Sequence, residues 1–153
     1  MKNINKIKSK ITKVKFGTNC RVIEPVNLYD CIIGNSVFVG PFVEIQKNSK
    51  IGNYTRVQSH TFICEKVSIG KNCFISHGTM FINDLAKFGQ VNRNSKYWKK
   101  TTIGNNVTIG SNSTILPVKI YNNIVVGAGS VVTKDLSIRG IYAGNPAKLI
   151  RRL

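Results

Sequence analysis

Hydrophobic positions recur every sixth residue along most of this chain. The longest uninterrupted run comprises Ile33, Val39, Ile45, Ile51, Val57, Ile63, Ile69, Ile75 and Phe81. Glycine directly follows four of these residues, and a second small or branched residue stands four positions after each. A period of six fits neither an amphipathic helix nor a simple alternating strand. It predicts a parallel β-solenoid in which each coil has three short flat sides.

The same register extends toward both ends of the chain. It includes Phe16, Val22 and Leu28 before this run, and Ile103, Ile109, Ile115, Ile120, Val126 and Val132 after it. One residue is missing after Leu28 and one after Ile115, so the spacing falls to five there. The eighteen hexads predict about six coils. We expect a single domain with a basic N-terminal segment (1–15), a β-helix (16–136) interrupted by a loop (84–102), and a C-terminal tail (137–153).

The composition adds a strong positive charge to this picture. The 153 residues include 23 Lys and Arg but 6 Asp and Glu, a formal net charge of +17. Such a balance favours nucleic acid or small anionic ligands such as nucleotide diphosphates and coenzyme A. Because the lysines are spread along the solenoid rather than gathered in a nucleic-acid motif, we favour the small ligands.

Other features bear on the cellular context. The four cysteines form no CxxC pair, so we expect reduced thiols and no structural metal. No apolar run approaches a membrane span, and no secretory signal is present, which predicts a cytoplasmic protein. The segment Met1–Lys15 alternates Lys with Ile and Val. We interpret it as a solvated end or coil cap, with binding to a membrane surface as the lesser alternative.

The hexad register predicts which residues share a corner of the prism. Glu65 and Asn83 are eighteen apart and both stand two places after an inward residue, so they are expected to stack. On the next corner, His77, Ser111 and Ala128 follow inward residues by two. Together with Gly110 and Gly127, they predict a groove in which the extended pantetheine chain could lie against backbone amides. For each of these, a purely structural role at a coil corner is the alternative.

The interruption between Phe81 and Ile103 is the second candidate region. It is polar and basic, and it carries Trp98, the single tryptophan of the chain. A long loop leaving a regular solenoid is usually functional, or it mediates subunit contact. We expect it to bind a nucleotide diphosphate, with Trp98 or Tyr97 stacked on the base.

Two C-terminal motifs give the chain a resemblance to a known family. The stretches Val126–Asp135 (VGAGSVVTKD) and Tyr142–Lys148 (YAGNPAK), with the hexads, resemble the hexapeptide-repeat acyltransferases. This resemblance implies a left-handed parallel β-helix, a homotrimer, and acyl-coenzyme A bound between subunits. The segments Phe62–Glu65 and Phe81–Asp84, with Trp98, look like N-acetyltransferases of nucleotide-linked 3-amino sugars in O-antigen or surface-glycan synthesis. A departure is Leu116-Pro117-Val118, where the family often reads Leu-Pro-Gly.

The resemblance implies an acetyl-coenzyme A-dependent N-acetyltransferase without a metal. Asn83 and Glu65 would orient the sugar amine, and His77 is the candidate base. His60, Asp84 and Trp98 are expected to contact the acceptor. Gly110, Ser111, Gly127, Ala128, Asn145, Pro146 and Arg151 are expected to contact the coenzyme.

Three other classes of protein compete with this interpretation. An O-acetyltransferase with His77 as its base remains open, and so does a non-enzymatic scaffold. A β-helix carbonic anhydrase requires three histidine ligands, and the chain has only His60 and His77. The sequence names neither the sugar, nor the nucleotide, nor the acyl group.

Overall fold

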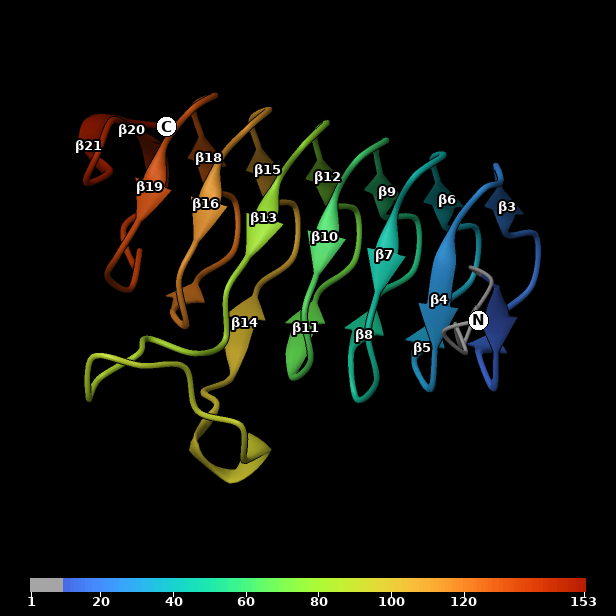
Figure 1. Cartoon of the computed structure of the whole chain (residues 1–153). Coiled ribbons are helices and arrows are strands. Elements are labelled where there is room, and N and C mark those ends of the chain that lie inside the picture. The colour runs from blue at the N-terminus through green and yellow to red at the C-terminus, as the bar shows by residue number, and fades with distance from the viewer. Residues whose placement is uncertain (1–9) are drawn as a thin grey trace.

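The computed structural model describes residues 10–153, which wind into a three-sided prism of short parallel strands (Figure 1). Sheet A contains β1 (Ile11–Thr12), β4 (Asn27–Tyr29), β7 (Glu44–Ile45), β10 (Phe62–Ile63), β13 (Met80–Phe81), β16 (Thr114–Ile115) and β19 (Val131–Val132). Sheet B contains β2 (Lys15–Phe16), β5 (Ile32–Ile33), β8 (Lys50–Ile51), β11 (Val67–Ile69), β14 (Thr101–Ile103) and β17 (Lys119–Ile120). Sheet C contains β3 (Arg21–Val22), β6 (Phe38–Val39), β9 (Arg56–Val57), β12 (Phe74–Ile75), β15 (Thr108–Ile109), β18 (Val125–Val126), β20 (Gly140–Ala143) and β21 (Lys148–Arg152).

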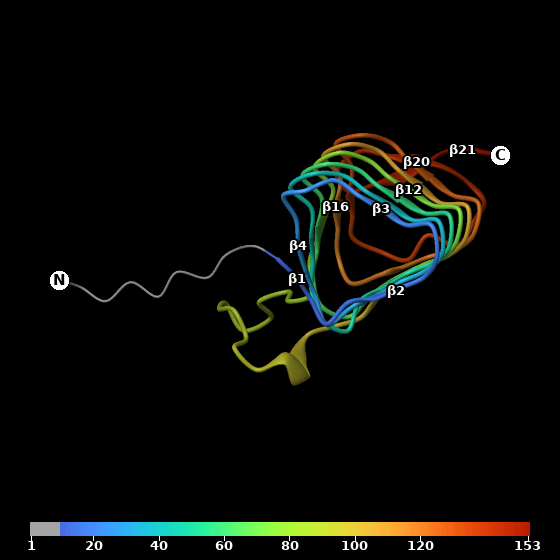
Figure 2. The ribbon, with the colours of Figure 1, turned by 90° about the vertical axis from the view of Figure 1, so that its right-hand side faces the viewer.

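The coil winds left-handed. Figure 2 views the prism from its N-terminal end, where the chain runs from β1 to β2 to β3 anticlockwise while later coils recede. The family resemblance implied this hand, and spacing alone left it open. Sheet A has seven strands, so the solenoid has about seven turns instead of the six predicted. The additional strand of sheet A is β1, and sheet C gains the parallel strand β20; both lie in segments that the hexad register did not reach.

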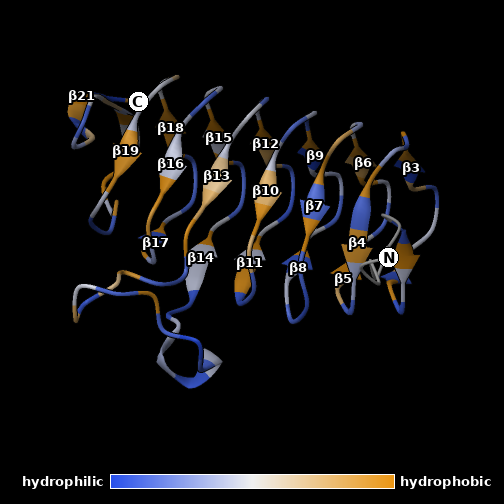
Figure 3. Cartoon of the chain, in the orientation of Figure 1, coloured by the Kyte–Doolittle hydropathy of each residue, from blue (hydrophilic) through white to orange (hydrophobic). Residues whose placement is uncertain are grey.

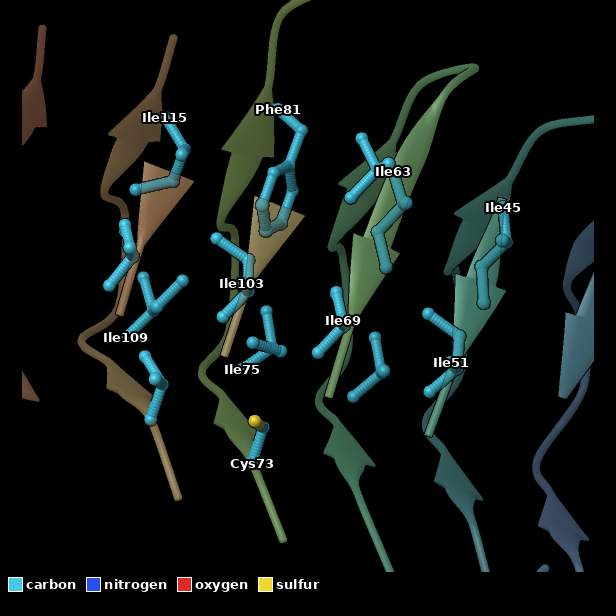
Figure 4. Close-up of a cluster of buried hydrophobic side chains, with 14 of the residues drawn as sticks. Ile45, Ile51, Ile63, Ile69, Cys73, Ile75, Phe81, Ile103, Ile109 and Ile115 are labelled. Atoms are coloured by element: carbon cyan, nitrogen blue, oxygen red, sulfur yellow. The ribbon is translucent and has the colours of Figure 1, made fainter. Parts of the chain in front are cut away.

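The predicted inward residues form the core, except in the first coil, where Phe16 is exposed and Val22 is half-buried because few coils cover that end. Figure 4 shows them stacked in ladders, with Phe81 between Ile63 and Ile115. All three side chains are at most 1% exposed. Buried polar residues between the ladders are satisfied by the neighbouring coil; for example, the Ser49 hydroxyl donates to the Cys64 carbonyl at 2.8 Å. Each coil therefore buries its apolar face on the next and supplies hydrogen bonds to it.

The corners require a left-handed backbone conformation. Six asparagines adopt positive φ, in agreement with the tolerance of this residue for that region: Asn19, Asn48, Asn72, Asn106, Asn112 and Asn123. Where the chain reads Leu116-Pro117-Val118, no residue of the corner has positive φ. The family departure at that position therefore coincides with an altered turn.

The insertion and the C-terminal end complete the fold. Between β13 and β14 the chain leaves the prism, and it contains the short 3₁₀ helix η1 (Ser95–Tyr97) (Figure 1). Strands β20 and β21 pair antiparallel over the last coil. Within residues 10–153 no helix is long and apolar enough to cross a membrane. The predicted basic segment 1–15 lies mostly outside the described residues.

Candidate active site

Glu65 and Asn83 lie on the same corner, between sheets A and B, as the register predicted. Each follows a strand of sheet A, β10 and β13, which are adjacent in the sheet. The Asn83 side-chain amide donates to the Glu65 backbone carbonyl at 3.3 Å. This bond fixes the position of the asparagine and leaves its amide oxygen available for another group.

Glu65 is buried although it lies at a corner of the prism. Its side chain is only 9% exposed, and one carboxylate oxygen lies 3.4 Å from the Lys47 ammonium. Burial, followed by the charges of Glu44 and Glu65, raises the pKa of the neighbouring Tyr29 phenol. The corner is therefore a sheltered acidic site within a basic chain.

His77 occupies the corner between sheets C and A, separated from Asn83 by a strand of sheet A. It is exposed, and its Nδ1 lies 2.8 Å from the Ser59 hydroxyl oxygen of the preceding coil. His60 lies at the same corner in an earlier coil, but its side chain has different contacts. It has φ +61° and stacks on Phe42 with ring centroids 4.8 Å apart. The structure explains His60 as a corner residue and gives it no contact with the Asn83 corner.

The backbone N–H groups at the corner predicted to hold the coenzyme differ in whether they have an acceptor. The N–H groups of Gly110 and Gly127 donate to Val126 and Tyr142 carbonyls, so they are not free for a ligand. The N–H groups of Ser111 and Ala128, by contrast, have no acceptor within residues 10–153. A Cβ at Gly110 would lie 2.4 Å from the Ala128 nitrogen, so only glycine fits there. The available donors are thus Ser111 and Ala128.

The C-terminal motif is hydrogen-bonded to the last coils of the prism. The Gly144 N–H donates to the Ser130 hydroxyl, and the Ala147 N–H donates to the Val131 carbonyl. These bonds place the exposed Asn145 and Pro146 beyond the Ala128 corner. Arg151 lies farther out, on β21 opposite Ile141, with its side chain exposed.

The insertion is organised around Asp84. Its carboxylate accepts hydrogen bonds from the Ala86 N–H and from both the N–H and side-chain amide of Asn92. These bonds, those from Asn92 first, lower the pKa of Asp84 below its ordinary value. The Trp98 indole donates to the Asn92 carbonyl at 2.8 Å. Asp84 and Trp98 are thus hydrogen-bonded inside the insertion, whereas the sequence analysis expected them to contact the acceptor.

A cavity of about 380 Å³ lies beside this hydrogen-bonded centre. Its apolar wall includes Leu85, Phe88 and Tyr97, and Lys87 and Lys99 also line it. The volume is in the range of small-molecule sites. Sequence reasoning identified Tyr97 and the basic character of the loop but not Phe88, which lies outside any repeat.

Within residues 10–153, no three His, Cys, Asp or Glu side chains converge as metal ligands. The cysteines in that range are free thiols, and burial raises the pKa of Cys31 to about 11 and that of Cys64 to about 12. Cys31 and Cys64 are therefore protonated core residues rather than nucleophiles.

Comparison with known proteins agrees with this geometry. Residues 30–65 match the family "Bacterial transferase hexapeptide (six repeats)", and residues 100–134 match "Hexapeptide repeat of succinyl-transferase". The two stretches flank the insertion and carry the same repeat. The chain therefore carries the repeat of the bacterial hexapeptide transferases.

Relatives of this family differ in length. The bifunctional protein GlmU of Wolbachia pipientis is 29% identical over 93% of this chain and 35% of its own length. GlmU of Clostridium botulinum strain Kyoto is 34% identical over 75% of the chain and 27% of its own length. The chain thus spans about a third or less of these relatives.

Solved structures share the fold. A mutant of AntD, an N-acyltransferase from Bacillus cereus in complex with dTDP and coenzyme A, is 25% identical with a TM-score of 0.81. The match covers 90% of this chain and 83% of that protein. A mutant of perosamine N-acetyltransferase from Caulobacter crescentus, in complex with coenzyme A and GDP-perosamine, has a TM-score of 0.62 at 19% identity. This match covers 92% of this chain and 57% of that protein, and it shows the fold alone.

Proposed function

We propose that this protein is an acetyl-coenzyme A-dependent N-acetyltransferase acting on the 3-amino group of a nucleotide-linked sugar. The observation that carries the proposal is the corner where Asn83 is hydrogen-bonded to the backbone carbonyl of the buried Glu65, beside an insertion with a nucleotide-sized cavity. The AntD structure, bound to dTDP and coenzyme A, supports the same pair of ligands.

The chemistry needs positioning more than it needs a strong base. The neutral sugar amine attacks the thioester carbonyl, and the C–N bond forms as the C–S bond breaks. The proton lost by the nitrogen passes to the departing coenzyme A thiolate. The Glu65 carboxylate attracts the amine, and the free Asn83 amide oxygen accepts one of its N–H groups. An attacking atom held in line by such contacts gains about 10²-fold or more over a loosely bound one.

The coenzyme is proposed to lie along the corner of Ser111 and Ala128. Consecutive coils are about 4.8 Å apart, so these two N–H groups form a short ladder of donors. The amide carbonyls of an extended pantetheine chain can accept from such a ladder, and the thioester oxygen from its inner end. Asn145 and Pro146 would bound the groove at the C-terminal coil, and Arg151 remains a candidate for the coenzyme phosphates.

The acceptor nucleotide is proposed to enter the cavity of the insertion. Phe88 and Tyr97 provide apolar faces for a base, and Lys87 and Lys99 provide charge for phosphates. Phe88 takes the stacking role in place of Trp98, because Phe88 lines the cavity and Trp98 does not.

The complete site is proposed to require a trimer. The Asn83 and Ala128 corners flank sheet A, so neither can reach the other within one subunit. Part of the outer surface of sheet A is apolar, at Phe62, the 42% exposed Met80 and Val131, and β10, β13 and β19 have hydrophobic colours in Figure 3. Sheets B and C instead carry Lys15, Lys50, Lys119, Arg21 and Arg56 outward. Packing of three A faces would bring one subunit's Asn83 corner to its neighbour's groove.

A thiol-release assay tests the reaction directly. Acetyl-coenzyme A is supplied with a panel of dTDP- and UDP-linked 3-amino sugars and their 3-hydroxy counterparts. We expect turnover with an amino sugar, loss of about 10²-fold in Asn83→Ala and Glu65→Ala, and a smaller loss in His77→Ala that shrinks as pH rises. A folded double variant of Asn83 and Glu65 with wild-type turnover would refute the mechanism.

Mixed assemblies test the location of the site. Asn83→Ala and Ala128→Trp each damage one half of the proposed site. If the two halves come from different subunits, refolding the variants together restores part of the activity. A fully active monomer by light scattering would exclude this arrangement.

Acetylation of a hydroxyl is the second candidate. The 2.8 Å contact between His77 Nδ1 and the Ser59 hydroxyl favours it, because it orients the imidazole with Nε2 free to act as a base. Turnover confined to the 3-hydroxy sugars, together with an inactive His77→Ala that no pH restores, would select this alternative.

A further inference from the structure

We propose that Lys66 is a positioning residue that sets the insertion relative to the Glu65–Asn83 corner, and so determines selectivity for the nucleotide-linked form of the acceptor. This inference rests on the proposed function. Lys66 directly follows Glu65, on the prism, and its backbone has φ +67°. It belongs to none of the motifs that point to the family.

The contacts of the Lys66 side chain all go to the insertion. Its ammonium group donates to the Ser95 carbonyl and, at 3.1 Å, to the Trp98 carbonyl. Those carbonyls bracket η1, which carries Tyr97 of the cavity. Charge-assisted bonds of this kind are about twice as strong as neutral ones. The one cation therefore holds the cavity wall to the prism.

The base of the insertion is tied to the same corner. The Lys99 N–H donates to the Asn83 carbonyl at 2.8 Å, and the Thr101 N–H donates to the Lys66 carbonyl at 3.3 Å. The amine-binding side chains and the cavity are thus joined at two points. Lys66 adds a third attachment, between the prism and the two ends of η1.

In this arrangement, two parts of one acceptor contact different groups of the protein. The amine would meet Glu65 and Asn83, and the nucleotide would meet Tyr97 and its neighbours. Releasing Lys66 changes the second contact and not the first. Removing the Lys66 ammonium group should consequently weaken turnover only for acceptors that carry the nucleotide.

The test compares Lys66→Met with Lys66→Arg and with Lys50→Met, an exposed lysine of sheet B that lies outside the insertion. Methionine keeps the unbranched side chain and loses the charge, and arginine retains donors for two carbonyls. For Lys66→Met we expect KM for the nucleotide-linked amino sugar to rise about tenfold, with kcat within about twofold of wild type. kcat/KM for the same amino sugar without its nucleotide should be unchanged. Lys66→Arg should recover most of the loss, and Lys50→Met should match wild type.

Trp98 provides a readout that is independent of turnover, since it is the one tryptophan. We expect Lys66→Met to shift its fluorescence to longer wavelength and to weaken binding of dTDP or UDP, titrated by that fluorescence, about tenfold. Unchanged fluorescence and affinity would overturn the proposal, and so would equal losses with full and truncated acceptors. If wild type acetylates no amino sugar, the proposed function fails, and the fluorescence and titrations still decide whether Lys66 holds the cavity.

Discussion

The prism and its insertion are stabilised in opposite ways. In the prism every coil repeats the same contacts, so the Ile63, Phe81 and Ile115 side chains are buried by equivalent neighbours above and below. In the insertion each contact occurs once: Asp84 binds Asn92, Trp98 binds Asn92, and Lys66 holds η1. Repetition spreads stability over many equivalent bonds, whereas a unique network depends on each member.

This difference separates stability from recognition. A solenoid accepts a long loop between coils because each coil contacts only its neighbours. The loop can then carry a shape that the repeat would not allow, such as the cavity beside Phe88 and Tyr97. Changes in the prism should therefore act on the whole molecule, and changes in the insertion should act on the cavity.

The largest effect is expected from Phe81→Ala. Phe81 is 1% exposed, and a cavity of this kind typically lowers the free energy of unfolding by about 3–5 kcal/mol. This free energy is measured by chemical denaturation monitored with circular dichroism. Phe88→Ala is the matched control, because Phe88 is 71% exposed and should leave that free energy within about 0.5 kcal/mol. Similar losses in both variants would contradict the distinction between the regions.

Asp84→Ala should impair the cavity of the insertion and leave the stability of the prism unchanged. It removes the acceptor of the Ala86 and Asn92 donors, so the insertion loses its centre. We expect KM for the nucleotide-linked acceptor to rise about tenfold or more and Trp98 fluorescence to shift, while the thermal midpoint of the prism stays near that of wild type. Cooperative unfolding at a much lower temperature would show that the insertion supports the prism.

A smaller change is expected from Asn105→Ala. The Asn105 side-chain oxygen accepts the Lys71 N–H of the preceding coil at 2.9 Å. Losing one such bond costs about 0.5–1.5 kcal/mol of unfolding free energy. Asn94→Ala breaks a similar bond to Lys96 within the insertion and should leave the unfolding of the prism unchanged. An unchanged midpoint for Asn105→Ala would mean that this corner bond is replaced by water.

The smallest effect is expected from lowering the pH. Because the pKa of Asp84 is lowered in the folded insertion, its contribution is complete above the ordinary aspartate pKa and is lost as pH falls through the lowered value. Trp98 fluorescence should therefore be constant from pH 7 to about pH 5 and change reversibly only below the ordinary range of Asp. Asp84→Ala should lack this transition. A change near pH 6 would point to a different group.

The sequence by itself determined the prism. A six-residue period leaves one packing solution for the inward residues, so it predicted the Glu65–Asn83 stack, the separate His77 corner and the ladder of Ile63 and Phe81. It undercounted the coils by one, because Ile11 precedes the first residue of the register that was found. These successes share a physical reason: in a solenoid, spacing along the chain is position in space.

Only the tertiary structure decided what lies outside the repeat. No period governs the insertion, so the inward turn of Trp98, the role of Asp84 as an acceptor and the reach of Lys66 depended on contacts between distant residues. The same holds for the burial of Glu65 and the free N–H groups of Ser111 and Ala128, since each depends on which partner the adjoining coil presents. Spacing fixes which residues are neighbours, but the hydrogen-bonding partners are settled only when the coils and the insertion pack together.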